Sequence, residues 1–119
     1  MPSLPSERER DAWEDILANA ESALHFTAGM TFVAFTADLR TNYAVVRCLE
    51  IVSEASRRLP TEAKARHPHI PWRDIADAGN VYRHGYHRVA LDIVWKTVQD
   101  QLPEIVAVCR AELDTPSAS

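Results

Sequence analysis

Apolar residues recur every three or four positions along most of this chain, which is the spacing of amphipathic helices. A first long helix is expected from near Ser6, whose hydroxyl can cap it together with Glu9 three residues later, until Gly29. Its apolar stripe consists of Trp13, Ile16, Leu17, Ala20 and Leu24. These spacings predict a helix that buries one face against the rest of the protein.

A second long helix is expected over about residues 39–59, where Asp38 can begin it and Pro60 ends it. Before it, Thr31 can cap a short helical turn through Phe35. The repeating apolar positions of the long helix are Val45, Leu49, Val52, Ala55 and Leu59. The helix is therefore predicted to belong to the core.

A more irregular stretch separates this helix from the next one. Thr61 is a candidate cap for a short turn through Arg66, and residues 67–71 should be largely extended because a residue before proline disfavours the helical region. The next helix is expected over residues 72–84, with Gly79 inside it. A glycine within a helix costs about 1 kcal/mol relative to alanine, so it suggests the close approach of another backbone or a lost side chain.

A last helical stretch is expected over residues 91–109, where Pro103 should kink or restart the helix. No segment alternates with period two for long, so strands are not indicated. The pattern predicts an all-α fold, a four- to five-helix antiparallel bundle formed by one domain, residues 1–119, with flexible ends at about 1–5 and 114–119. One core fits this length, and a homodimer interface would add useful burial, so a homodimer is expected.

Composition excludes several classes of protein. Apolar residues make up 46% and charged residues 25% of the chain, as in folded soluble domains. Neither a run of ~20 apolar residues nor the order of a signal peptide is present, so no membrane association and a cytoplasmic location are expected. Cys48 and Cys109 lack a ligand or redox spacing and should be buried thiols. His67 and His69 are spaced like a metal pair without a further ligand, so neither metal nor cofactor is expected.

Polar groups are concentrated in residues 73–88. On a helix, five of them share one face, at successive spacings of four, three, four and three: Arg73, Asp77, Asn80, His84 and His87. A solvated helix face accounts for such a row, but imidazole is also the side chain best suited to moving a proton near neutral pH. The flanking aromatic residues would serve either as stacking surfaces for bases or as core anchors; they are Trp72, Tyr82 and Tyr86.

Charge is distributed unevenly along the chain. The formal net charge is −4, yet the segment 57–88 carries seven cations against three anions and four of the five histidines. An acidic protein with one basic segment can attract phosphate locally. Outside that segment, Arg47 and Glu50 stand three residues apart on the second long helix and are expected to form an ion pair worth a few tenths of a kcal/mol.

In their order and separations, several segments make the chain resemble the HepT family of the HEPN superfamily, small helical nucleotide-associated proteins once classed as a domain of unknown function. The resemblance covers nearly the whole length. The segments that carry it are residues 14–17, 44–55, 58–60, 70–76, 84–86 and 91–95.

The resemblance implies a dimerising HEPN-type bundle that acts as the toxin of a toxin–antitoxin pair, opposite a small nucleotidyltransferase of the MNT type. Many family members are metal-independent ribonucleases with the signature Arg-Asn-x-x-x-His-x-Tyr. Asn80, His84 and Tyr86 match this signature, whereas Gly79 stands at the arginine position. Tyr86 would be the hydroxyl that receives adenylyl groups from the antitoxin, which neutralises the toxin.

The resemblance also implies roles in catalysis. His84 would move a proton while the ribose 2′-hydroxyl attacks the adjacent phosphate, with Asn80 as a further catalytic candidate. Arg83 or Arg73 would have to stabilise the developing charge. Arg83 is adjacent to the histidine and Arg73 lies about 16 Å away along the helix axis, so each would act from the partner of a two-fold dimer.

The resemblance further implies RNA, either tRNA or mRNA, as the substrate. It would be bound by Arg73, Arg83, His87 and Arg88. Loss of one principal stabiliser of the transition state costs ~100- to 1,000-fold in rate. Gly79 therefore leaves an alternative, a catalytically inactive HEPN module that binds nucleotide or RNA, or acts as a scaffold.

Overall fold

The computed structural model describes residues 6–84 and 91–116, and within these ranges every regular element is helical. The elements are α1 (Glu7–Thr27), α2 (Phe32–Ala37), α3 (Leu39–Arg57), α4 (Thr61–Ala65), α5 (Trp72–His84), α6 (Leu91–Lys96), a π-helical turn (Thr97–Gln101) and α7 (Leu102–Leu113). The prediction of an all-α bundle is confirmed.

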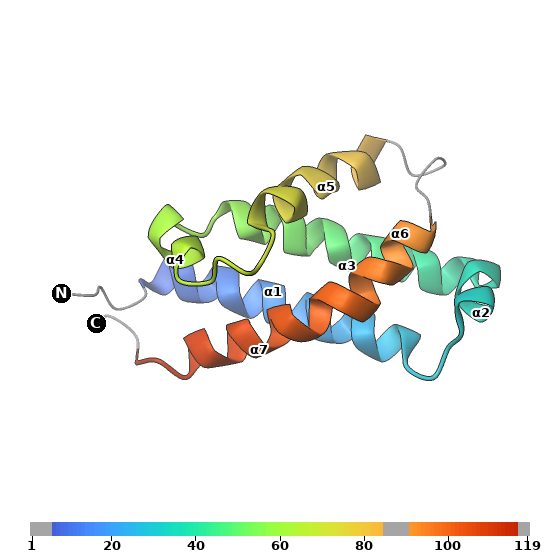
Figure 1. The fold of residues 1–119 in the computed structure, drawn as a ribbon, viewed down its shortest axis with the longest axis horizontal. Helices are drawn as coiled ribbons and strands as arrows, with labels where there is room; N and C mark the ends of the chain where they lie inside the picture. The colour runs from blue at the N-terminus through green and yellow to red at the C-terminus, as the bar shows by residue number, and fades with distance from the viewer. Residues whose placement is uncertain (1–5, 85–90, 117–119) are drawn as a thin grey trace.

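Helix α1 packs against both α3 and α7 (Figure 1). Helix α5 packs on α3, and the short α2 lies at the end of the molecule far from both termini. The core is formed by the stripes expected from the sequence, with Trp13 and Ile16 from α1, Val45 from α3 and Phe35 from α2 fully buried. Among residues 6–84 and 91–116, no helix is both long and apolar enough to cross a membrane.

Three helix starts follow the expected side-chain caps. The backbone N–H of Glu9 donates to Ser6 Oγ at 3.1 Å, and Thr31 and Asp38 cap α2 and α3 in the same way. Gly29 follows the end of α1 with a φ of 77°, a left-handed conformation that favours glycine. Each cap is a contact over three residues, which is why local sequence is enough to predict it.

The connection between α3 and α5 differs from expectation. Thr61 is the first residue of α4 rather than its cap, and Pro60 holds the cap position without a side-chain hydrogen bond. Residues 67–71 form a turn rather than an extended segment, because the N–H of Ile70 donates to His67 O at 3.1 Å. Pro68 takes the second turn position, which suits proline, and Ile70 is thereby buried.

The last helical segment runs from α6 through α7 and accommodates Pro103 by a local change of helix type (Figure 1). Proline has no N–H and its ring clashes with the carbonyl four residues earlier in an α-helix. The preceding π-helical turn widens the backbone, so that the N–H of Leu102 donates to Thr97 O five residues back. Pro103 then lies in the first turn of α7, and the predicted restart of the helix is confirmed.

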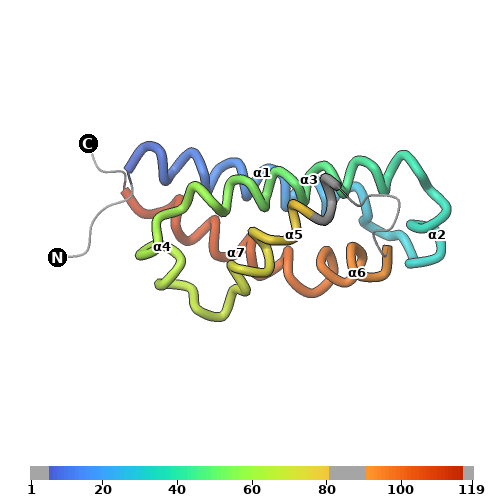
Figure 2. Tube along the Cα trace, turned by 90° about the horizontal axis from the view of Figure 1, so that it is seen from above, coloured from blue at the N-terminus to red at the C-terminus, as the bar shows by residue number. Residues whose placement is uncertain are grey.

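An ionic cluster fastens the α4–α5 connection to the end of the bundle where α1 begins and α7 ends (Figure 2). Arg66 Nη2 donates to buried Glu9 of α1 at 2.9 Å and to buried Glu112 of α7 at 3.0 Å. His67 Nε2 lies 2.6 Å from Glu112 Oε2. Burial raises the pKa of Glu112, but the hydrogen bonds from Arg66 and His67 outweigh burial, and the net pKa lies below its ordinary 4.5. The cluster holds Arg66 and His67 of the α4–α5 connection against α1 and α7.

Close to the same end, the guanidinium of Arg10 donates to Leu113 O at 2.9 Å and to Thr115 O at 2.6 Å. The part of the C-terminal segment that the structure describes is therefore bound to α1. Residues 1–5 and 117–119 lie outside the described residues.

Candidate functional site

Helix α5 carries the polar row singled out in the sequence. The side chains of Arg73, Asp77 and Asn80 are all exposed, as a shared outer face requires. The helical backbone continues to His84, but the described side chains of α5 end at Asn80. The other candidates either belong to the last turn of α5, of which only the backbone is described, or fall outside the described residues. The first group is Tyr82, Arg83 and His84, and the second is Tyr86, His87 and Arg88.

Trp72, at the start of α5, is a core anchor and not a stacking surface. Its Nε1 donates to the carbonyls of Lys64 and His67, both at 3.1 Å. Its ring meets that of Trp13 edge to face, with centroids 5.9 Å apart. Of the two readings of this aromatic residue, packing is correct.

Ser53 of α3 fastens the middle of α5 to α3. Its hydroxyl donates to Ala76 O at 2.9 Å and accepts from the backbone N–H of Gly79 at 3.2 Å. Arg57, one turn further along α3, also donates to Ala76 O. The two helices are therefore joined by hydrogen bonds at the position where the HepT signature has its arginine.

Gly79 is buried at this crossing, and its lack of a side chain is what allows the close approach. A Cβ atom at position 79 would lie 2.3 Å from Ser53 Oγ and 2.9 Å from Ser53 Cβ. Both separations are shorter than real Cβ contacts. The group that approaches this mid-helix glycine is a side chain, that of Ser53, rather than another backbone as one sequence-based alternative held, and an arginine would not fit here beside it.

A small pocket of about 90 Å³ opens beside Gly79. Its other walls come from α3 and are polar, four of them charged; they are Arg47, Glu50, Ser53, Glu54 and Arg57. Arg47 Nη1 lies 3.5 Å from Glu50 Oε2, which confirms the expected ion pair. The guanidinium groups of two arginines therefore line the pocket, whereas Gly79 contributes only backbone.

The described cations of the basic segment 57–88 do not form one continuous patch. Arg58 is paired with Asp15 of α1 at 2.6 Å, and Arg66 is held by Glu9 and Glu112. Both are therefore neutralised by acids from outside the segment. Arg57 and Arg73 remain as exposed cations on or beside α5.

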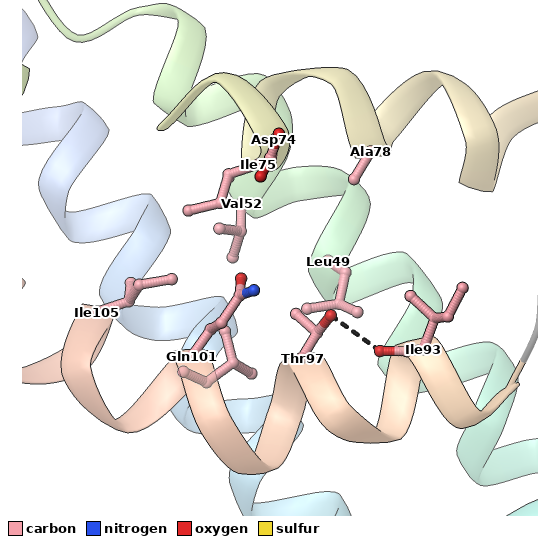
Figure 3. Close-up of a pocket in the computed structure, with 10 residues that line it drawn as sticks. Leu49, Val52, Asp74, Ile75, Ala78, Ile93, Thr97, Gln101 and Ile105 are labelled. Atoms are coloured by element: carbon pink, nitrogen blue, oxygen red, sulfur yellow. Dashed lines mark hydrogen bonds between the residues drawn. The ribbon is translucent and has the colours of Figure 1, made fainter. Parts of the chain in front are cut away.

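A larger and mostly apolar cavity of about 180 Å³ lies on the opposite side of α5, between α3, α5 and the α6–α7 segment (Figure 3). Leu49 and Val52 form its floor, and Ile75 and Ala78 line it from α5. Asp74 is the one titratable group in this lining. A single exposed carboxylate provides no acid–base pair, so this cavity offers packing surface and no recognisable chemistry.

The cysteines are buried, as expected. Burial raises the pKa of Cys109 to about 12 and also raises the pKa of Cys48. Thiols with pKa values raised in this way are poor nucleophiles. Among the described residues, no group of three or more His, Cys, Asp or Glu side chains could hold a metal ion.

Comparison with known proteins agrees with this architecture. The family model described as Ribonuclease HepT-like matches residues 16–112. A "probable ribonuclease HepT" of Thermococcus cleftensis is 38% identical over 96 residues, which cover 81% of this chain and 87% of that protein. A "putative RNase" of Methanocaldococcus jannaschii is 34% identical over 76% of this chain and 78% of its own length.

A "putative RNase" of Caldanaerobacter subterraneus is 35% identical over 77% of this chain and 82% of its own length. No solved structure matches the chain. The family match spans α5 and α3, on which α5 packs, so it includes the described part of the candidate site. The chain belongs to the HepT-like ribonuclease family.

Proposed function

We propose that this protein is an RNA-directed, metal-independent endoribonuclease of the HepT type that works as a homodimer. One observation carries the proposal: a family match over 16–112 joined to a helix, α5, that holds Asn80 and His84 at the signature spacing. The exposure of Asn80 supports a polar face that is open to a substrate.

The proposed chemistry needs only groups that the chain and RNA supply. The 2′-hydroxyl of a ribose attacks the adjacent phosphorus while the imidazole of His84 takes its proton. The new O2′–P bond forms as the P–O5′ bond breaks, and the O5′ leaving group acquires a proton. The products are a 2′,3′-cyclic phosphate and a 5′-hydroxyl end. A cation must stabilise the charge on the phosphate oxygens in the transition state.

RNA, either tRNA or mRNA, is the proposed substrate, held through its phosphates by Arg73, Arg83, His87 and Arg88 in the cytoplasm. Arg73 is exposed near the start of α5, in agreement with this role. The proposed control is that of a toxin–antitoxin pair. A nucleotidyltransferase antitoxin would adenylylate Tyr86, two residues from His84, and would place bulk and negative charge beside the imidazole.

The test compares cleavage of tRNA and mRNA by the purified protein and by His84→Ala. His25→Ala is the matched control, because His25 is exposed on α1, outside the basic segment. We expect His84→Ala to lose at least 100-fold in rate and His25→Ala to retain the wild-type rate. Cleavage that is indifferent to His84→Ala would contradict the proposed catalytic role.

Gly79 specifically favours a second candidate, a catalytically inactive HEPN module that binds RNA or nucleotide, or acts as a scaffold. The room for an arginine side chain at position 79 is taken by Ser53. This candidate predicts RNA binding, or binding of the nucleotidyltransferase, without cleavage by the wild type. Sedimentation of the chain as a monomer at micromolar concentration would contradict the homodimer in both versions.

A further inference from the structure

We propose that Arg47 of α3 supplies the guanidinium that binds the RNA phosphate. In the HepT signature this group belongs to the residue at position 79, where this chain has glycine. The inference rests on the proposed ribonuclease function and names a residue that neither the signature nor α5 contains. It makes the small charged pocket beside Gly79 a phosphate subsite.

The antiparallel register of α3 and α5 places Arg47 on the correct stretch of α3. Arg57 contacts Ala76, and Ser53, one turn earlier on α3, contacts Gly79, three residues further along α5. Each step towards the start of α3 therefore leads towards the end of α5. Arg47 precedes Ser53 by six residues, about 9 Å of helix, and His84 follows Gly79 by five residues, about 7.5 Å.

The side chain of Arg47 is available for a ligand. It lines the same pocket as Gly79, and 69% of its side-chain surface is exposed. Its one described partner is Glu50, at 3.5 Å, and an exposed pair of this kind contributes about 0–1 kcal/mol. A phosphate dianion or phosphodiester can therefore displace Glu50 at little cost.

Arg57 is the weaker candidate, although it lines the same pocket. Its guanidinium donates to Ala76 O and thereby helps to hold α5 on α3. It also lies ten residues beyond Arg47 on α3, on the side of Gly79 away from His84. Arg57 therefore contributes to the position of α5, and Arg47 is free to contact the substrate.

The pocket also has two acidic residues in its walls, and they determine how it can bind phosphate. Glu50 and Glu54 balance the two arginines, so the pocket does not attract phosphate by net charge alone. Binding has to come from the directed N–H groups of Arg47, which a planar guanidinium can offer in pairs to phosphate oxygens. Removal of the Glu50 charge should then strengthen binding, while removal of Arg47 should weaken it.

The experiment uses full-length wild type, Arg47→Ala, Arg47→Lys, Glu50→Gln and the matched control Arg58→Ala. Arg58→Ala also removes one cation from the end of α3, but Arg58 pairs with Asp15 of α1 and does not line the pocket. Two readouts are measured: the cleavage rate of tRNA and mRNA, and the affinity for a fluorescent single-stranded RNA as a function of salt. Far-UV circular dichroism checks that each variant is folded.

We expect Arg47→Ala to slow cleavage ~100- to 1,000-fold and to reduce the salt slope of binding by about 0.7, the value for one phosphate contact on a single strand. Arg47→Lys should recover the slope but only part of the rate, because a point charge replaces a paired donor. Glu50→Gln should bind RNA more tightly, and Arg58→Ala should match the wild type.

The inference would be overturned if Arg47→Ala and Arg58→Ala had the same cleavage rate and the same salt slope of RNA binding. This holds even if the wild type cleaves RNA and His84→Ala does not, a result that would support the ribonuclease proposal alone. If wild type binds RNA without cleaving it, the ribonuclease proposal fails, and the salt slope alone decides for or against Arg47. If wild type binds no RNA at low salt, both proposals are refuted.

Discussion

Gly79→Ala is the most direct test of the contact between α3 and α5. The new Cβ would meet two atoms, Ser53 Oγ at 2.3 Å and Ser53 Cβ at 2.9 Å, both from one side chain. The hydroxyl would have to rotate away, and α5 would have to move outward by a fraction of an ångström. The perturbation is therefore confined to one pair of residues.

The magnitude follows from what is lost and gained. Rotation of Ser53 forfeits its hydrogen bonds with Ala76 and Gly79, at about 1 kcal/mol each, and overpacking costs about 1–3 kcal/mol more. Alanine returns about 1 kcal/mol of helix propensity relative to glycine. We expect Gly79→Ala to lower the free energy of unfolding by about 2–4 kcal/mol, opposite in sign to the usual effect of glycine-to-alanine exchange in a helix.

The control is the same substitution in a Ser53→Gly background. Both clashing atoms are then absent, so Gly79→Ala should be neutral or stabilising by up to ~1 kcal/mol. Urea unfolding of the four proteins, followed by circular dichroism, should give a coupling energy of about 3 kcal/mol. Additive effects within about 0.5 kcal/mol would refute the close contact. The same logic makes Ser53→Gly a necessary companion of Gly79→Arg in any attempt to rebuild the signature arginine.

Three further predictions concern the ionic cluster and the buried thiols. Arg66→Met should lower the free energy of unfolding by about 3 kcal/mol in a urea titration, because Glu9 and Glu112 stay buried without their cation. The folded pKa of Glu112 lies below its ordinary value, so its contribution to the free energy of unfolding is complete above pH ~4.5 and is lost as the pH falls through the folded pKa. Glu112→Gln should remove this part of the acid dependence of stability, measured by urea titrations at several pH values. With its pKa raised to about 12, Cys109 in a Cys48→Ala variant should react with a thiol reagent at pH 8 roughly 1,000-fold more slowly than in urea, and equal rates would contradict its burial.

Most features that depend on a few neighbouring residues were predictable from the sequence, although the cap predicted at Thr61 was wrong. The caps at Ser6, Thr31 and Asp38 and the end of α1 at Gly29 are local hydrogen bonds or dihedral preferences, and the structure has them all. The turn at residues 67–71 was not predictable in the same way. Proline restricts the residue before it, but the burial of Ile70 decides the conformation, and burial depends on helices distant in sequence.

In the candidate site, too, features set by one helix were predictable and features set by distant residues were not. The spacing rule correctly predicted that Arg73, Asp77 and Asn80 share an exposed face, because one helix determines their directions. The bond between Ser53 and Gly79 joins residues 26 apart, and only the register of α3 on α5 brings them together. One local signal did point to it, since a glycine within a helix needs a packing reason to offset its cost.

The burial of position 79 also constrains where the phosphate cation can come from. An arginine there would replace the hydroxyl of Ser53 that now holds α5 on α3, so the tight helix contact and the signature side chain exclude each other. A chain that keeps the contact must take its cation from a position other than 79. Helix α3 offers Arg47 in the pocket beside Gly79, while Arg58 and Arg66 are bound to acids elsewhere. If this chain cleaves RNA, its phosphate cation within one subunit is therefore expected on α3 and not on the signature helix.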